Sequence, residues 1–287
     1  MQQADLNTTL DQKNDPRLKM SYGALFVGPP GSGKSTCVAT LKEMCDKLKR
    51  KCIVINLDPA NIHPTYTPNF DVCTIIDVKT TMEEEKLGPN GALMFCMETI
   101  AASTHEITKA LKPIIEGGSY ILIDCPGQVE LYTHSDCMKQ FIEDFQKDLN
   151  ARLAVVNLVD IVLASTVTGF LGQSLMSLGT MLRLYTPHIN VLSKFDLAAE
   201  LDLPYDPFDA NFDDFLIHGN ADSSDSDDEI KCNYIIKSVP NKLHDSIVEI
   251  LTQFDLVSYS QFTTSDETTV MELIQLIDKA VGCTWML

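Results

Sequence analysis

The sequence has few positive charges, and arginine is especially scarce. Its 287 residues carry 22 Lys and Arg against 40 Asp and Glu, for a formal net charge of −18, and Arg50 is followed only by Arg152 and Arg183. Nucleic acids and anionic membrane surfaces are bound by clustered basic side chains, so this balance argues against direct binding to either. A single nucleotide stays compatible with it, because a nucleotide needs only a local pocket.

Long apolar runs and closely spaced cysteine pairs are also absent. The longest apolar stretch, residues 151–165, is interrupted by Asn157 and Asp160 and is unsuited to spanning a bilayer. Residues 1–20 are polar and charged, which predicts no signal peptide. Nine cysteines are scattered without C-x-x-C pairs or the spacing of cysteine metal ligands, which is typical of buried thiols in a reducing compartment. We therefore expect no membrane contact.

Apolar runs rich in β-branched residues alternate with segments of helical period from Tyr22 onwards. This alternation predicts an α/β fold with a mostly parallel sheet and helices on both faces. The predicted strands cover residues 22–27, 52–57, 120–123, 153–159, 189–192 and 256–262. The predicted helices cover residues 35–49, 91–116, 132–149, 168–184, 242–254 and 267–281. We expect a flexible head over residues 1–20 and a single domain over residues 21–287.

One acidic insert departs from this alternation. Residues 220–229 contain no apolar side chain after Ala221 and are rich in Asp and Ser. Such composition predicts a disordered surface loop over about residues 219–230. Ser223, Ser224 and Ser226 are candidate phosphorylation sites in this acidic setting.

A phosphate-binding loop is predicted by the unbroken G-x-x-x-x-G-K-S sequence of residues 28–35, which follows an apolar run and precedes a helical pattern. Its backbone N–H groups and the helix N-terminus suit phosphate, Lys34 reaches the β/γ-phosphates, and the Ser35 hydroxyl can bind Mg²⁺. A dinucleotide-binding G-x-G-x-x-G motif would need a third glycine at Thr36. This loop predicts a P-loop NTPase, with nucleotide contacts from Gly28, Pro29, Pro30, Gly31, Ser32, Gly33, Lys34, Ser35 and Thr36.

Two strand-end carboxylates are candidates for the metal and the water. Asp124 ends a predicted strand and opens a D-x-x-G-Q sequence, which favours a carboxylate beside Mg²⁺. In that sequence Gly127 can donate its backbone N–H to the γ-phosphate, and Gln128 can orient the attacking water. Asp58 ends the second predicted strand, on the same sheet edge, and is interpreted as a magnesium-shell or water-activating carboxylate. The predicted metal ligands are Ser35, Asp58 and Asp124.

Guanine recognition is indicated by residues 193–196, which read S-K-F-D where GTPases carry N-K-x-D. Asp196 can accept hydrogen bonds from N1–H and the exocyclic amine of guanine, a donor pair that adenine does not present. Lys194 would lie along the ring. Ser193 replaces the usual Asn, so one supporting polar contact differs.

The remaining motif is Gly88, Pro89 and Asn90, which by themselves would only close a turn. Together with the phosphate-binding loop, D-P-A from Asp58 and the motifs at 124–130 and 193–196, they make the chain resemble the GPN-loop GTPases. The resemblance runs from about residue 22 to residue 282. Asn61 and the run 188–194 look more like eukaryotic paralogue 2 than paralogue 3.

This resemblance implies a homodimer or a paralogue heterodimer that hydrolyses GTP to GDP and phosphate with Mg²⁺. The catalytic residues would be Asp58, Asn90 and Gln128, with residues 88–90 approaching the partner's nucleotide. It also implies a cytoplasmic protein, with possible passage to the nucleus, that supports RNA polymerase assembly or import. RNA polymerase II subunits or import adaptors would be its protein partners.

Two other classes stay open at the level of sequence. One is a P-loop kinase that uses ATP and a small acceptor, although the scarcity of arginine argues against its usual basic lid. The other is a non-hydrolysing assembly factor whose bound nucleotide only fixes the shape of a dimer.

Overall fold

The computed structural model describes residues 20–115, 118–201, 203, 205–208, 212–215 and 241–284. The expected head, except for Met20, and the acidic insert with its three serines lie outside these residues.

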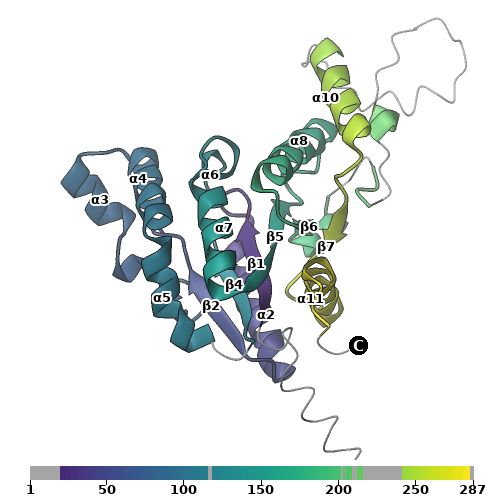
Figure 1. Ribbon diagram of the computed structural model, residues 1–287. Coiled ribbons are helices and arrows are strands. Elements are labelled where there is room, and N and C mark those ends of the chain that lie inside the picture. The colour runs from purple at the N-terminus through teal and green to yellow at the C-terminus, as the bar shows by residue number, and fades with distance from the viewer. Residues whose placement is uncertain are drawn as a thin grey trace, which may run out of the picture.

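A seven-stranded sheet forms the centre of the molecule, with the strand order β3-β2-β4-β1-β5-β6-β7 (Figure 1). Every strand pairing in it is parallel, which confirms the predicted sheet. The strands are β1 Ser21–Val27, β2 Cys52–Asn56, β3 Phe70–Asp71, β4 Tyr120–Asp124, β5 Ala151–Asp160, β6 His188–Ser193 and β7 Tyr259–Gln261.

Helices connect the strands and cover the sheet. The α-helices are α2 Lys34–Lys47, α3 Val78–Glu85, α4 Pro89–Ala102, α5 Thr104–Ile115, α6 Glu130–Thr133, α7 Cys137–Leu149, α8 Val167–Leu184, α10 Asn241–Phe254 and α11 Glu267–Val281. Short 3₁₀ helices occur as η2 Val72–Thr74, η3 Phe195–Ala199 and η4 Phe212–Phe215. Within the described part of the chain, no helix has both the length and the apolar character that crossing a membrane requires.

Two predicted helices are each broken in the structure. The helix predicted over 91–116 divides at Ser103 into α4 and α5. Here the buried Thr104 hydroxyl donates to the carbonyl oxygen of Ala101 at 2.8 Å and competes with helical backbone bonding. The helix predicted over 132–149 is interrupted before α7, where the hydroxyl of Ser135 accepts from the N–H of Cys137 at 3.2 Å.

The sheet buries apolar side chains on both faces. Along β1, Leu25 and Val27 pack with the cluster under α4, α5 and α7, whereas Ala24 and Phe26 pack with the cluster under α2 and α11. Burial on both faces explains why these strands are almost entirely apolar. A third cluster surrounds Phe170 of α8 and includes side chains of α10. This arrangement leaves the carboxyl ends of the parallel strands at one edge, where ligands bind in open α/β sheets.

Candidate nucleotide-binding site

The phosphate-binding loop, residues 28–35, joins β1 to α2 and depends on glycine geometry. Gly28 has φ +136°, a conformation that side-chain-bearing residues rarely adopt. A Cβ atom added to Gly28 would also lie 2.3 Å from the carbonyl oxygen of Leu158. The backbone of β5 therefore presses directly against the start of the loop, and only glycine fits there.

Lys34 is held inside this loop. Its Nζ donates to the carbonyl oxygens of Gly28 and Pro29, each at 2.9 Å, and the residue is only 8% exposed. Burial lowers the pKa of Lys34, and the negative charges of Asp124 and Asp58 oppose that shift. The ammonium group is therefore already desolvated and positioned beside the loop, as a phosphate ligand would require.

Gly127 approaches the loop so closely that even a Cβ atom there would be tightly packed. A Cβ atom on Gly127 would lie 3.0 Å from Nζ of Lys34 and 3.1 Å from Cα of Pro30. The structure thus brings together the lysine and the glycine that the sequence assigns to the terminal phosphates.

Asp124 forms the polar centre of the site. Its Oδ2 accepts from the Ser35 hydroxyl at 2.7 Å and from the Tyr66 hydroxyl at 2.8 Å, while Nδ2 of Asn61 donates to Oγ of Ser35 at 3.2 Å. The other carboxylate oxygen, Oδ1, is buried and has no hydrogen-bond partner among the described residues. Burial raises the pKa of Asp124, and the hydrogen bonds from Ser35 and Tyr66 act against that shift.

Asp58 lies on the same sheet edge. The neighbouring Leu57 donates its N–H to the carbonyl oxygen of Asp124 at 2.8 Å, and Oδ1 of Asp58 accepts from the N–H of Ala60 at 2.9 Å. Burial raises the pKa of Asp58, the nearby charge of Asp124 adds to the rise, and Lys34 lowers it.

These donors fit a magnesium ion. Mg²⁺ takes oxygen ligands and usually combines one or two protein carboxylates or hydroxyls with waters and substrate phosphates. Ser35, Asp58 and the unpartnered Oδ1 of Asp124 offer this chemistry. The described residues include no cluster of three or more His, Cys, Asp or Glu that could hold a metal ion.

Asn90 meets Gln128 within the same chain. Gly88 is the N-cap of α4, Pro89 is its first residue, and Asn90 follows in the exposed first turn. Nε2 of Gln128 donates to Oδ1 of Asn90 at 3.0 Å. The structure therefore brings two of the predicted catalytic residues together in cis, whereas the intersubunit contact of Asn90 stays a prediction.

The base-recognition segment, residues 193–196, is joined to the phosphate-binding loop. The buried hydroxyl of Ser193 donates to the carbonyl oxygen of Ser32 at 2.8 Å and lies 3.2 Å from that of Val159. Although Ser193 stands where GTPases usually carry Asn, its hydroxyl joins the base-recognition segment directly to the phosphate-binding loop.

Lys194 and Asp196 each have a partner that the sequence did not indicate. Nζ of Lys194 lies 2.6 Å from Oδ2 of Asp160, the last residue of β5. Oδ1 of the exposed Asp196 accepts from the Thr263 hydroxyl at 3.2 Å. Asp160 was detectable as another acid at a strand end, but Thr263 and Tyr66 belong to no recognisable motif.

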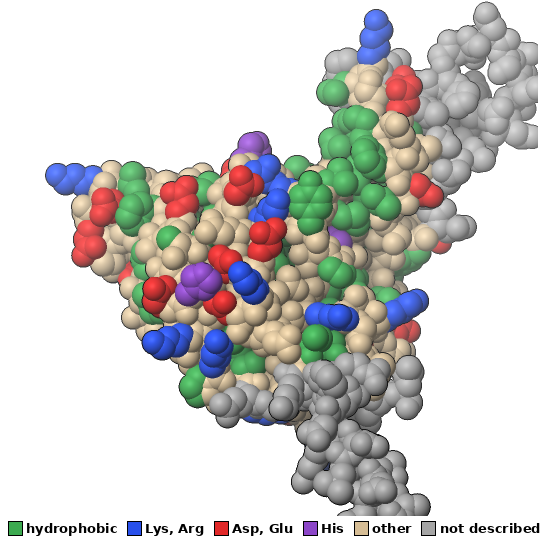
Figure 2. Space-filling model, viewed as in Figure 1, with side chains coloured by type: hydrophobic (Ala, Val, Ile, Leu, Met, Phe, Trp, Pro, Cys, Tyr) green, Lys and Arg blue, Asp and Glu red, His purple; other side chains and the backbone are tan. Residues whose placement is uncertain are grey.

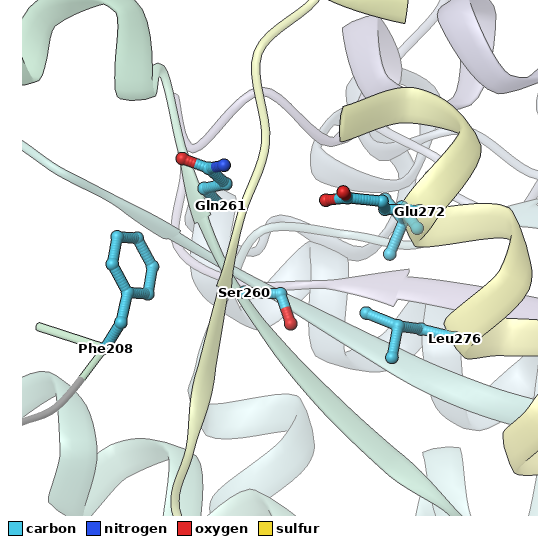
Figure 3. Close-up of a pocket in the computed structure, with 6 residues that line it drawn as sticks. Phe208, Ser260, Gln261, Glu272 and Leu276 are labelled. Atoms are coloured by element: carbon cyan, nitrogen blue, oxygen red, sulfur yellow. The ribbon is translucent and has the colours of Figure 1, made fainter. Parts of the chain in front are cut away.

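A separate hollow of about 250 Å³ lies beside β7 and α11 (Figure 3). In this view Phe208 lies on one side of the strand, while Glu272 and Leu276 lie on the other. Phe208 also packs against Phe195 of the base-recognition segment, with ring centroids 5.1 Å apart. None of the predicted site residues lines it.

An all-parallel sheet with a phosphate-binding loop, a carboxylate on the neighbouring strand and a base-recognition segment two strands away defines a P-loop nucleotide-binding protein. The crystal structure of a GTPase from Pyrococcus abyssi in its apo form shares this fold. It matches with a TM-score of 0.71 and 20% identity, over 92% of this chain and 98% of that chain.

Sequence comparisons give the family. A family model described as "Conserved hypothetical ATP binding protein" matches residues 26–283. The GPN-loop GTPase 2 homolog of Dictyostelium discoideum is 34% identical over 270 residues, which cover 92% of this chain and 80% of that protein. GPN-loop GTPase 2 of Danio rerio is 34% identical, with 92% and 81% covered, and that of Saccharomyces cerevisiae is 32% identical, with 92% and 75% covered. The chain belongs to the GPN-loop GTPase family.

Proposed function

We propose that this protein binds GTP with Mg²⁺ and hydrolyses it to GDP and phosphate. The observation that carries the proposal is the hydrogen bond from Ser193 to the carbonyl oxygen of Ser32. This bond holds the segment that carries Asp196 against the loop that carries Lys34, as the base and the phosphates of one nucleotide would require. The names of the relatives, which are GTPases, support the same substrate.

Binding depends on charge neutralisation at the phosphate end. The Lys34 ammonium would exchange the loop carbonyls for β- and γ-phosphate oxygens, and Ser35, Asp124 and Asp58 would hold the metal. When bound, Mg²⁺ supplies positive charge that stabilises the electron density developing on the phosphate oxygens. Phosphoryl transfer asks little covalent chemistry of the protein, so positioning and charge account for most of the catalysis.

Hydrolysis depends on a positioned water. The Gly127 N–H binds a γ-phosphate oxygen, and Gln128 orients the attacking water. The water oxygen forms a bond to the γ-phosphorus as the bond to the β–γ bridging oxygen breaks. The leaving GDP keeps that bridging oxygen, and the proton of the water passes to the released phosphate.

The subunit arrangement and the cellular role rest on the family resemblance. We infer a homodimer or paralogue heterodimer in which Asn90 serves the partner's site. Figure 2 shows hydrophobic side chains gathered over α8 and α10, whose exposed side chains include Met176, Leu182, Leu243 and Ile250. Exposed apolar patches of this kind favour a protein partner. The inferred location is the cytoplasm, with passage to the nucleus, and the inferred clients are RNA polymerase II subunits or import adaptors.

Phosphate release from GTP and from ATP tests the enzymatic proposal, because the family model's description names ATP. We expect Mg²⁺-dependent release from GTP in a single-turnover assay, with and without a small acceptor. Transfer to an acceptor would instead support the kinase class, and a bound but uncleaved GTP would support the non-hydrolysing factor. Equal affinity for ATP and GTP would contradict the role of Asp196.

Native mass spectrometry tests the dimer, and a pull-down in the GTP-bound and GDP-bound states tests the clients. We expect polymerase subunits or import adaptors to be retained in only one nucleotide state. Capture of neither class in either state would contradict the cellular role while leaving the hydrolysis proposal intact.

A further inference from the structure

Tyr66 belongs to none of the sequence motifs, yet it contacts Asp124 at the centre of the site. It lies in the segment between β2 and β3 and is half-buried. Its hydroxyl donates to Oδ2 of Asp124 at 2.8 Å. The contact spans 58 residues of sequence, so it depends on the folded path of this segment.

The hydrogen bonds at Asp124 are divided unequally between its two oxygens. Oδ2 accepts from both Tyr66 and Ser35, whereas Oδ1 is buried and has no partner among the described residues. Two donors on one oxygen fix the rotation of the carboxylate group. Oδ1 therefore keeps its lone pairs free in a fixed direction, and an unpaired carboxylate oxygen is unfavourable in a buried site unless a ligand uses it.

Several hydrogen bonds hold the segment that carries Tyr66. Asn69 accepts from the N–H of Val54 at 2.8 Å and donates its own N–H to the carbonyl oxygen of Val54 at 2.7 Å. Nearer its start, Nδ2 of Asn56 donates to the carbonyl oxygen of Asn61 at 2.9 Å. These bonds fix the backbone on both sides of Tyr66, so the position of its hydroxyl is determined by the fold.

Tyr66 acts as the donor in this hydrogen bond, because a phenol hydroxyl can donate and an ionised carboxylate oxygen can only accept.

We propose that Tyr66 is a positioning residue for Mg²⁺, which acts by holding Oδ2 of Asp124 so that Oδ1 faces the metal or its water. The inference rests on the proposed binding of Mg²⁺ and guanine nucleotide. Partners that orient a metal-binding carboxylate typically change metal affinity by about 10- to 100-fold when removed. Tyr66 should therefore affect how much Mg²⁺ is needed, and leave the metal-free affinity for the nucleotide unchanged.

The test compares Tyr66→Phe with the parent full-length protein, using the fluorescent nucleotide N-methylanthraniloyl-GDP. Dissociation of this probe is followed over a range of Mg²⁺ concentrations and also in excess EDTA. We expect the Mg²⁺ concentration for half-maximal retention to rise about tenfold, with the same dissociation rate in EDTA. Unchanged binding in EDTA also shows that the variant is folded.

Tyr259→Phe is the matched control, because it too removes a tyrosine hydroxyl, one that lies 3.1 Å from that of Ser174. It should leave the Mg²⁺ requirement unchanged. A Tyr66→Phe curve within twofold of the parent would overturn the proposal, and so would weaker binding in EDTA, which would show a structural role. If the parent itself binds no guanine nucleotide, the proposed function fails first, and the two failures are thereby distinguished.

Discussion

The two sides of the site differ in burial and in the number of contacts. On the phosphate side, Lys34, Ser35 and Asp124 are joined to one another or to the loop by buried or partly buried hydrogen bonds. On the water side, Asn90 and Gln128 share one exposed hydrogen bond. We infer that a single chain already holds what nucleotide binding needs, whereas the groups that orient water are held loosely.

The largest effect is expected from a change on the phosphate side. Lys34→Ala should weaken GTP binding by about 2 to 4 kcal/mol, because a buried phosphate loses its charge-assisted partner, which corresponds to a ~30- to ~1,000-fold higher Kd. Titration calorimetry measures it. Lys42→Ala is the control, since Lys42 lies on the same helix but pairs with Asp46 at the surface. Unchanged affinity in Lys34→Ala would mean that the loop does not bind triphosphate.

A substitution in the base-recognition segment should weaken GTP binding less, and it should alter which base the site prefers. Asp196→Asn should weaken GTP binding about 10- to 100-fold, because it removes hydrogen bonds between the charged carboxylate and guanine. It should improve binding of xanthosine triphosphate, whose C2 oxygen accepts from the new amide. Direct competition between the two nucleotides measures the shift, and a parallel loss of both would point to misfolding.

On the water side, turnover should fall without a matching loss of binding. Asn90→Ala should lower kcat about three- to tenfold, as expected for one neutral hydrogen bond made in the transition state, with little effect on GTP affinity. Turnover rates at saturating GTP measure kcat, and a separate binding titration measures the GTP affinity. An equal loss of kcat and of GTP affinity would contradict the distinction between the phosphate side and the water side.

Mixing two variants of reduced turnover distinguishes a cis from a trans role of Asn90. If Asn90 serves the partner, a mixed dimer of Asn90→Ala and Gln128→Ala contains one complete site, and part of the activity returns. If the observed contact within one chain is the functional one, every site in the mixture lacks one residue and activity stays low. Native mass spectrometry must show that mixed dimers have formed.

The smallest effect is expected from removing an exposed hydrogen bond that lies outside the nucleotide-binding site. Nδ1 of His105 lies 2.6 Å from Oδ2 of Asp148, and this hydrogen bond with its charge raises the pKa of His105 and lowers that of Asp148. Because the histidine pKa is higher in the folded state, its stabilisation is complete below the unfolded pKa and is lost as pH rises through the folded one. His105→Gln should lower the Tm by roughly 1 °C at pH 5.5 and by nothing measurable at pH 9. Differential scanning calorimetry at both pH values measures it, and an equal loss at both would show that charge is not the cause.

Much of the phosphate side was predictable because its residues follow strand ends. Asp124 closes β4, and the phosphate-binding loop follows β1 in register with it, so the rule that carboxyl ends of parallel strands share an edge brings the two together. The links made by Ser193 and Asp160 were not predicted, although each of these residues ends a strand. Their partners could have been sought by comparing strand ends across the sheet.

Features that depend on the path of irregular backbone could not be predicted. The position of Tyr66 is set by hydrogen bonds that Asn56 and Asn69 make across a segment without periodicity. The two-residue strand β3 is too short for a repeating pattern. The break at Ser103 depends on a buried threonine hydroxyl that selects backbone carbonyls over solvent, which is a property of the packed helix pair.

The Lys34 ammonium, paired with two loop carbonyls, has a consequence for nucleotide release. When a product leaves this loop, the cation returns to acceptors 2.9 Å away, so the vacated loop holds no unpaired buried charge. This exchange of one set of oxygen acceptors for another should lower the free-energy cost of emptying the loop. We therefore expect the empty loop to be a stable state of this chain, ready to take up the next nucleotide.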